Sequence, residues 1–156
     1  MAGRIGAAYR RHSPDHNKAA FRAIVKRGPP PGLLAFDGDR AVGWCQVTPR
    51  SELPALDRVR HLKRVDEMPV WSISCFYVRI GYRRKGVTKV LIAEALKMAK
   101  RARTQALEAY PFDAALSPSA SSTGYATTFE RAGFKIVARR IPARPIMRHD
   151  LKRLAG

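Results

Sequence analysis

The stretch that decides the fold covers residues 71–89 and reads WSISCFYVRIGYRRKGVTK. From Trp71 to Val78 it mixes aromatic, β-branched and small residues, a composition that favours a strand with one buried face. From Val87 to about Arg103 apolar residues recur at the spacing of one helix face, with lysines and arginines between them. The stretch therefore predicts a strand, a basic turn and a long amphipathic helix.

The basic turn has the composition expected of a phosphate-binding loop. It contains Arg83, Arg84 and Lys85 and ends at Gly86, directly before the predicted helix. The first N–H groups of a helix have no partner within the helix, and its N-terminus carries a partial positive charge. A glycine there lets the backbone approach an anion closely, so the turn predicts a site for a phosphorylated ligand.

This turn resembles the acetyl-coenzyme A signature of the GNAT superfamily of N-acetyltransferases, Arg/Gln-x-x-Gly-x-Gly/Ala. Arg83 stands at the Arg/Gln position and Gly86 at the first glycine, whereas Thr88 stands where the family usually has Gly or Ala. Two neighbours also depart from the pattern, because Ile80 replaces a frequent proline and Arg84 a frequent glycine. An unrelated strand-turn-helix unit with a basic turn is the alternative.

A second match strengthens the resemblance. Residues 129–134, FERAGF, resemble the Tyr-Glu-x-x-Gly-Phe sequence with which the family ends a helix. The two matches span about residues 70–136, and they imply acetyl-CoA as cosubstrate and no metal. The cofactor contacts that the resemblance implies lie on the end of the strand, the turn, the helix start and the second match: Phe76, Tyr77, Val78, Arg83, Arg84, Lys85, Gly86, Val87, Thr88, Lys89 and Phe129.

The resemblance also implies a reaction in which an acceptor amine attacks the thioester directly. The pantetheine arm is expected to lie beside the strand that ends at Val78, and a backbone N–H near Phe76 or Tyr77 is expected to stabilise the oxyanion. The amine must lose a proton, and Glu108 is the nominated catalytic base. A carboxylate at a strand position can equally be a surface group or part of an ion pair.

The departing thiolate needs a proton, and many family members supply it from a tyrosine at the position where this chain has Phe129. Tyr125 lies four residues earlier, on the same face of a helix expected over about residues 123–132, and is the nominated catalytic substitute. The open alternatives are a tyrosine buried in the core, unassisted release of thiolate, and a domain that binds CoA without catalysis.

The remaining elements fit one α+β domain over residues 1–156, a three-layer arrangement with a mixed, mainly antiparallel sheet and helices on both faces. Ser13 and Pro14 predict the start of a helix that reaches about residue 27, and Asp37-Gly38 predicts a hairpin turn. No strand precedes this helix, so the first strand of the family is missing, truncated or irregular. Residues 1–12 lack periodicity and are expected to be irregular or disordered. Further expected elements are a loop over 49–68, a serine-rich loop over 117–123 and strands over 106–110, 134–139 and 144–151.

Charge supports a rival function. The chain has 30 Lys and Arg against 12 Asp and Glu, a net charge of +18, and such a protein attracts polyanions at low salt. Aromatic residues are not interleaved with the basic ones as a single-strand platform requires, so nucleic acid is expected to bind only nonspecifically. A silent or nucleic-acid-associated GNAT domain is the alternative to an enzyme.

Location and acceptor follow from weaker signals. No apolar run has the length of a membrane helix and no secretory leader is visible, so a soluble cytoplasmic protein is expected. Cys45 and Cys75 lack metal-ligand spacing and are expected to be buried, reduced thiols. The acceptor is an unidentified amine on a small molecule or a protein. The sequence does not decide between a monomer and a homodimer. Four acids in the loop over 49–68 provide either solubility or recruitment of a cationic acceptor: Glu52, Asp57, Asp66 and Glu67.

Overall fold

A computed structural model describes residues 2–113 and 122–151 of the chain. In these ranges six strands form one sheet in the order β1-β2-β3-β4-β6-β5. β3 and β4 are parallel, and every other neighbouring pair is antiparallel, which confirms the predicted mixed, mainly antiparallel sheet. The strands are β1 (Gly32–Asp37), β2 (Arg40–Pro49), β3 (Trp71–Val78), β4 (Ala106–Ala109), β5 (Lys135–Ala138) and β6 (Ile146–Asp150).

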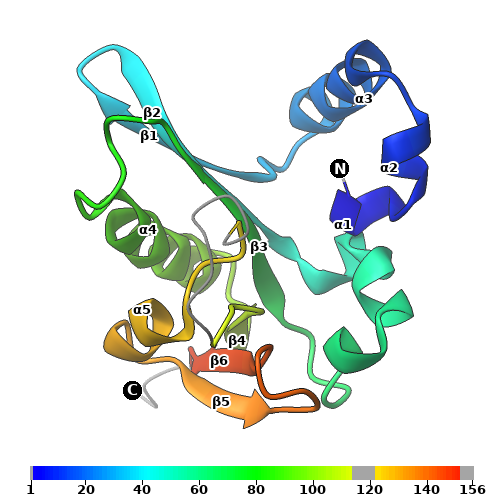
Figure 1. The fold of residues 1–156 in the computed structure, drawn as a ribbon, viewed down its shortest axis with the longest axis vertical. Coiled ribbons are helices and arrows are strands. Elements are labelled where there is room, and N and C mark those ends of the chain that lie inside the picture. The colour runs from blue at the N-terminus through cyan, green and yellow to red at the C-terminus, as the bar shows by residue number, and fades with distance from the viewer. Residues whose placement is uncertain (1, 114–121, 152–156) are drawn as a thin grey trace.

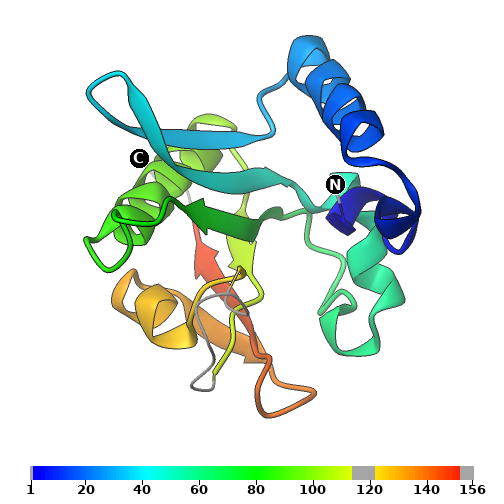
Figure 2. The same cartoon turned by 45° about the horizontal axis from the view of Figure 1, so that its top comes forward.

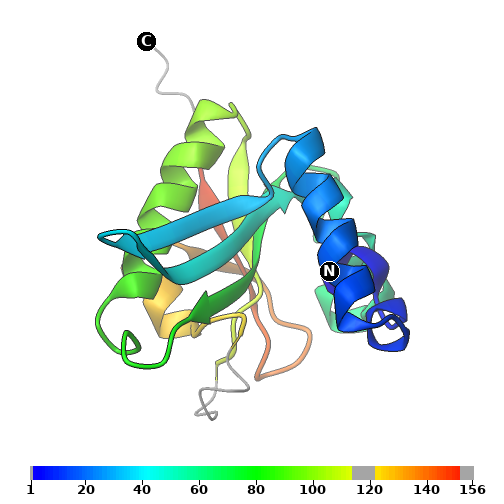
Figure 3. The same ribbon diagram turned by 90° about the horizontal axis from the view of Figure 1, so that it is seen from above.

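Helical segments cover both faces of the sheet, as predicted (Figures 1 and 3). One face carries α4 (Val87–Arg101) and α5 (Ala126–Arg131), whose apolar residues pack on Cys45, Val47 and Ile73 of the sheet. The other face carries α1 (Ala2–Ile5), α2 (Ala8–Arg11) and α3 (Pro14–Arg27) with three 3₁₀ turns, η1 (Arg50–Glu52), η2 (Pro54–Arg58) and η3 (Arg60–Leu62). A second apolar cluster lies under these turns and consists of Leu53, Leu56, Leu62, Tyr110 and Ile146.

The N-terminal region corrects one prediction and confirms another. Residues 1–12 were expected to be irregular, but α1 and α2 occupy most of them. Their order comes from tertiary contacts that periodicity cannot show, since Arg4 donates to Glu52 over 2.9 Å. The helix predicted from Ser13 is α3, with Ser13 Oγ accepting from the His16 N–H at 3.2 Å. No strand precedes α3 in the described ranges, and the sheet begins with β1.

The helix expected over residues 123–132 is shorter than predicted. α5 begins at Ala126, and Tyr125 is its N-cap in an extended conformation, with φ −107° and ψ 142°. A bridge to Phe112 holds Tyr125 extended, and the Ala126 N–H donates to the Phe112 carbonyl at 2.9 Å. Tyr125 and Phe129 are therefore not two positions on one helix face. Residues 117–121 of the predicted serine-rich loop lie outside the described residues.

Two backbone features shape the region between β2, β3 and α4. Gly43 of β2 lies directly under the first turn of α4, where an added Cβ would come within 2.6 Å of Val87 Cγ1. In β3, Ser74 is an extra residue opposite the Gln46–Val47 step of β2, which is a β-bulge. β3 pairs with β4 only from Trp71 to Ile73, so the rest of β3 has no strand neighbour on that side. In Figure 2 the β1–β2 hairpin projects beyond this open part of the sheet.

Candidate active site

A cavity lies between the open end of β3, the basic turn, α4 and α5. It has two adjoining lobes of about 510 and 770 Å³, which share five lining residues: Val78, Arg84, Thr88, Tyr125 and Thr128. We call it the α4–α5 cavity. Its volume suits an extended ligand rather than a single small group.

The turn at one end of this cavity has an open helix N-terminus. Gly86 is the N-cap of α4 in a left-handed conformation, with φ +81°, and no side chain caps the helix. A Cβ at Gly86 would meet nothing within 4 Å, so the space in front of the first turn is free. Arg84 is also left-handed, with φ +61°, which explains why glycine suits this position.

The positive charges of the turn are not neutralised within the described residues. No salt bridge there involves Arg83, Arg84, Lys85 or Lys89, although the Arg83 Nε–H donates to the Val78 carbonyl at 3.0 Å. Free cationic groups beside unpaired helix N–H groups form a site for a phosphorylated anion.

Nine of the eleven predicted cofactor residues line the α4–α5 cavity: Phe76, Tyr77, Val78, Arg83, Arg84, Gly86, Val87, Thr88 and Lys89. Lys85 is not among its lining residues and lies over the Tyr82 ring, with Nζ 5.7 Å from the centroid. Phe129, which was also predicted to contact the cofactor, does not line the cavity either. It is fully buried between Phe76 and Phe134, with ring centroids 6.0 and 5.0 Å away, so the core rather than a ligand occupies its surface.

Glu108 belongs to a buried ion network and not to the cavity. Its side chain is 1% exposed, and its two carboxylate oxygens accept from Arg50 at 3.1 Å and from Arg148 at 2.8 Å. Tyr110 also donates to it, at 2.9 Å. A carboxylate fixed between two guanidinium groups has no free lone pair directed at a substrate, so the prediction of a general base is corrected to a structural role.

Three of the four acidic loop residues, Glu52, Asp57 and Asp66, have structural partners as well. Asp57 pairs with Arg50 at 2.7 Å and Asp66 pairs with Arg148 at 2.8 Å. Burial favours the neutral form of Asp57, but the hydrogen bond and charge of Arg50 outweigh it and lower its pKa. The hydrogen bond from Arg148 lowers the pKa of Asp66. Asp57 and Asp66 therefore serve the ion network, whereas recruitment of a cationic acceptor by the loop stays a prediction.

One of the two predicted oxyanion donors already has a partner. The Phe76 N–H donates to the Ser122 carbonyl at 2.6 Å, because the chain entering α5 lies beside the open part of β3. N–H groups of consecutive strand residues point to opposite edges, and the Arg79 N–H reaches Val42 of β2. The Val78 N–H therefore faces the open edge and the cavity, whereas the Tyr77 N–H faces β2.

Several features of the cavity had no signal in the sequence. Thr128 lines both lobes, yet nothing in the local pattern marks it as a ligand-facing residue. By contrast, Tyr125, the nominated proton donor, lines both lobes from the N-cap of α5.

The cysteines differ in burial. Cys45 is buried, with a pKa raised to about 12 by burial, and Cys75 is only half-buried. The described residues hold no group of three or more His, Cys, Asp or Glu arranged for a metal, and no helix among them could span a membrane.

Comparison with known proteins identifies the family. The model of the acetyltransferase (GNAT) family matches residues 5–127. Among solved structures, an N-acetyltransferase from Staphylococcus aureus is 18% identical with a TM-score of 0.60, covering 90% of this chain and 79% of its own. YncA from Salmonella typhimurium with its cofactor acetyl-CoA is 17% identical with a TM-score of 0.58, covering 93% and 78%. The PaiA N-acetyltransferase of Thermoplasma acidophilum in complex with coenzyme A is 14% identical with a TM-score of 0.53, covering 89% and 80%. No curated protein matches the sequence. The chain belongs to the GNAT family of acetyltransferases.

Proposed function

We propose that this protein transfers the acetyl group of acetyl-CoA to a primary amine. The amine nitrogen attacks the thioester carbonyl carbon, the C–N bond forms and the C–S bond breaks. The amine loses one proton and the CoA thiolate takes one, so the products are the acetamide and free CoA. The observation that carries this proposal is the α4–α5 cavity, which joins an uncapped, cationic helix start to the open edge of β3.

In this proposal the basic turn binds the phosphates. Arg83, Arg84 and Lys89 line the cavity around the first turn of α4, where free N–H groups add directed donors. Gly86 keeps the approach open, since a side chain there would project into the space in front of the helix. The rest of the ligand would follow the cavity wall from Thr88 towards the end of β3.

The oxyanion would be stabilised by the N–H of Val78. This donor faces the open edge of β3, and a donor placed where negative charge develops lowers a barrier by about 3 to 4 kcal/mol in well-studied sites. The Ser122 carbonyl, which accepts from Phe76, occupies the adjacent position along the strand. We therefore move the proposed donor from residues 76 and 77 to Val78.

Deprotonation of the amine would not need a carboxylate base. No Asp or Glu among the described residues lines the α4–α5 cavity. A positive environment disfavours the charged ammonium form and lowers the pKa of a bound amine. The neutral amine would release its proton to water after attack, so the reaction rate should rise with pH through the pKa of the bound acceptor.

Tyr125 is the proposed proton donor to the CoA thiolate, because it lines both lobes at the point where they join. Tyr125→Phe should lower kcat by about 10²-fold, the usual scale for general acid catalysis, with cofactor affinity nearly unchanged. Release of free thiol from acetyl-CoA in the presence of a panel of amines measures this. Phe129→Tyr should not rescue the variant, since Phe129 is buried between two phenylalanines.

A CoA-binding protein without transferase activity is the second candidate. Two observations favour it. The chain has phenylalanine at position 129, where many family members have the tyrosine that protonates the thiolate. The Phe76 N–H already donates a hydrogen bond to the Ser122 carbonyl, so one donor at the open edge of β3 is occupied. The same assay separates the two functions. Tight binding of acetyl-CoA with no thiol release for any amine would support the silent domain, whereas turnover that depends on an amine would support the enzyme.

A further inference from the structure

The larger lobe of the α4–α5 cavity has cations from two different helices. This lobe, of about 770 Å³, is lined by Lys89 in the first turn of α4 and by Arg131 in the last turn of α5, and we call it the outer lobe. Neither residue lines the smaller lobe beside Phe76 and Tyr77, which we call the inner lobe. Arg84 lines both lobes. The cations therefore extend beyond the basic turn, on the side of the cavity away from Phe76 and Tyr77.

Lys89 and Arg131 have no anionic partner among the residues that the structure describes. Both residues are exposed, and no salt bridge in the described ranges involves either of them. No described Asp or Glu lines the outer lobe. Cations without partners in one cavity create a positive potential, which attracts an anionic group of a ligand. The outer lobe therefore favours a phosphate.

The other lining residues of the outer lobe suit a flat, apolar group. Ala93 and Leu96 of α4 line it together with Ala132 and the aromatic residue Tyr82. Nucleic-acid bases bind to such surfaces through their faces. Lys85 does not line either lobe, and its Nζ lies 5.7 Å from the centroid of the Tyr82 ring. Lys85 is therefore not a candidate for the phosphate of the outer lobe.

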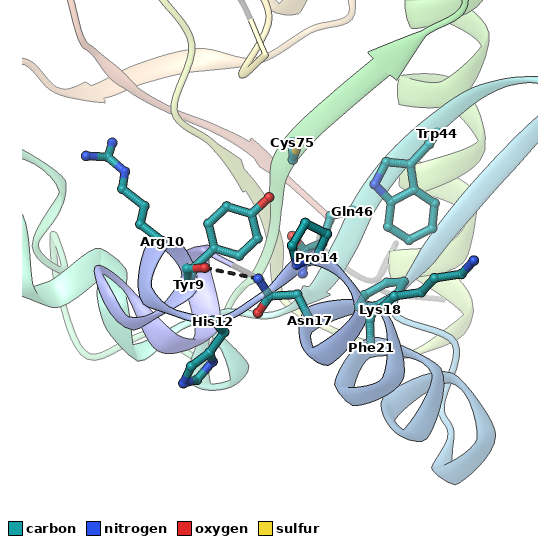
Figure 4. Close-up of a pocket in the computed structure, with 10 residues that line it drawn as sticks. All are labelled: Tyr9, Arg10, His12, Pro14, Asn17, Lys18, Phe21, Trp44, Gln46 and Cys75. Atoms are coloured by element: carbon teal, nitrogen blue, oxygen red, sulfur yellow. Dashed lines mark hydrogen bonds between the residues drawn. The ribbon is translucent and has the colours of Figure 1, made fainter.

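A second cavity shows that cations alone do not define such a site. It has about 610 Å³, lies between α2, α3 and the sheet, and is lined by Arg10 and Lys18 (Figure 4). Figure 4 shows these two side chains at opposite rims, and Ser13 Oγ caps the start of α3. In the α4–α5 cavity, by contrast, the cations line the same cavity as an uncapped helix start. That cavity combines free N–H groups for one phosphate group with separate cations for another.

Coenzyme A carries phosphate in two places. A diphosphate joins the pantetheine arm to the adenosine, and a separate phosphate monoester is attached to the 3′ oxygen of the ribose. A phosphate monoester has a charge of about −1.5 to −2 near pH 7, so it is the most highly charged of the phosphates. The N–H groups at the start of α4, with Arg83 and Arg84, suit the diphosphate. The monoester requires cations of its own beyond the turn.

We propose that Arg131 and Lys89 bind the 3′-phosphate of CoA and make the protein selective for CoA over 3′-dephospho-CoA. The adenine packs on the apolar wall of the outer lobe, and the pantetheine arm lies in the inner lobe. Arg131 is then a cofactor-binding residue of α5, at a position of the FERAGF match that the family sequence leaves unspecified. This inference rests on the proposed function for the identity of the cofactor, and it does not depend on transfer of the acetyl group.

The first test compares two ligands that differ by one phosphate. Calorimetric titration at physiological salt should give the wild type a Kd for CoA about tenfold below that for 3′-dephospho-CoA. In Arg131→Gln the Kd for CoA should rise about tenfold, whereas that for 3′-dephospho-CoA should change by less than about twofold, because this ligand lacks the bound group. Lys89→Gln should act in the same direction with about a threefold rise. Arg131→Lys should keep part of the selectivity, since it keeps the charge.

Arg101→Gln is the matched control. Arg101 is an exposed arginine in the last turn of α4, as Arg131 is in the last turn of α5, and it lines neither lobe. The variant removes the same charge from the same position of a helix, so both Kd values should stay within about twofold of the wild type. Equal weakening of CoA binding in Arg101→Gln and Arg131→Gln would overturn the proposal, since net charge alone would then explain the effect.

The second test separates binding from chemistry. With an amine that is acetylated, Arg131→Gln should raise the KM for acetyl-CoA about tenfold and leave kcat within about twofold of the wild type. The reason is that the 3′-phosphate is held equally in the ground state and in the transition state, so its loss removes uniform binding. A fall in kcat with an unchanged KM would contradict the assignment of Arg131 to the 3′-phosphate.

These readouts separate this inference from the proposed function. Equal affinity of the wild type for CoA and 3′-dephospho-CoA, with acetyl transfer retained, would overturn the inference and leave the proposed function standing. Selective CoA binding that depends on Arg131, with no amine acetylated, would support the inference and contradict the proposed function. Selectivity that survives in both Arg131→Gln and Lys89→Gln would overturn the inference, and absence of binding of either ligand would overturn both.

Discussion

Two groups of arginines in this molecule have the same chemistry and different surroundings. Arg50 and Arg148 are buried and face carboxylates, and both bind Glu108. Arg83 and Arg84 lie on the turn before α4, are exposed, and form no salt bridge among the described residues. Carboxylates of the protein itself bind the first group, which we call the closed group. The second group is available to bind a ligand, and we call it the open group.

The difference shows how to interpret a strongly basic chain. Net charge of +18 says only that polyanions are attracted. Partners decide which cations are available, because a guanidinium held by two carboxylates contributes to the fold and cannot also bind phosphate. The closed group should therefore affect stability, and the open group should affect affinity.

The largest expected effect is on stability. Arg50→Met removes a cation that bonds Glu108, Asp57 and Tyr110, and leaves the buried carboxylate of Glu108 with Arg148 as its cationic partner. We expect a loss of about 3 to 5 kcal/mol in the free energy of unfolding, measured by urea denaturation. Arg83→Met is the matched control in the open group and should change it by less than about 0.5 kcal/mol. Similar losses of unfolding free energy in Arg50→Met and Arg83→Met would contradict the distinction between the closed and the open group.

A smaller effect is expected on affinity in the open group. Arg84→Gly removes a cation that lines both lobes of the α4–α5 cavity. The affinity for acetyl-CoA should fall about tenfold, or about 1.4 kcal/mol, as one charge contact with phosphate is lost. Stability should be unchanged or slightly higher, because φ of +61° suits glycine better than arginine. A loss of stability with full affinity would contradict the assignment.

The smallest effect concerns acid pH. The pKa values of Asp57 and Asp66 are lowered in the folded protein, so their ion pairs contribute stability above about pH 4, the usual value for an unfolded aspartate. This contribution is lost as the pH falls through the lower folded pKa values. Because both side chains are more than a third exposed, it should amount to less than about 1 kcal/mol. Urea denaturation at pH 7 and pH 3 should show a weaker pH dependence in Asp57→Asn.

Local signals in the sequence predicted most of the secondary structure. Ser13 and Pro14 place the start of α3, and the Asp37-Gly38 turn joins β1 to β2, because a cap and a hairpin turn depend on a few adjacent residues. The basic turn before α4 was found in the same way. These elements carry their cause within a single stretch of chain.

The errors arose where the cause is distant in sequence. Glu108 resembled a base because Arg50, 58 residues away, could not be recognised as its partner. Tyr125 was placed inside a helix because its bridge to Phe112 is a tertiary contact. The bulge at Ser74 and the close approach of Gly43 to Val87 likewise depend on how β2 meets its neighbours. No periodicity in one segment records such contacts.

The central claim is that the turn before α4 binds acetyl-CoA, and a pair of glycine variants tests it most directly. Gly86 and Gly81 both have positive φ, +81° and +93°, and both have open space where a Cβ would lie. Gly86 lines the α4–α5 cavity and Gly81 does not, so valine strains the backbone at both positions but faces the ligand only at 86.

The measurement is calorimetric titration of acetyl-CoA at physiological salt into the wild type and both variants, with folding checked for each. The account predicts that the wild type binds, that Gly81→Val binds within about threefold of it, and that Gly86→Val binds at least tenfold more weakly. Absence of binding to the wild type, or unchanged affinity in Gly86→Val, would contradict it.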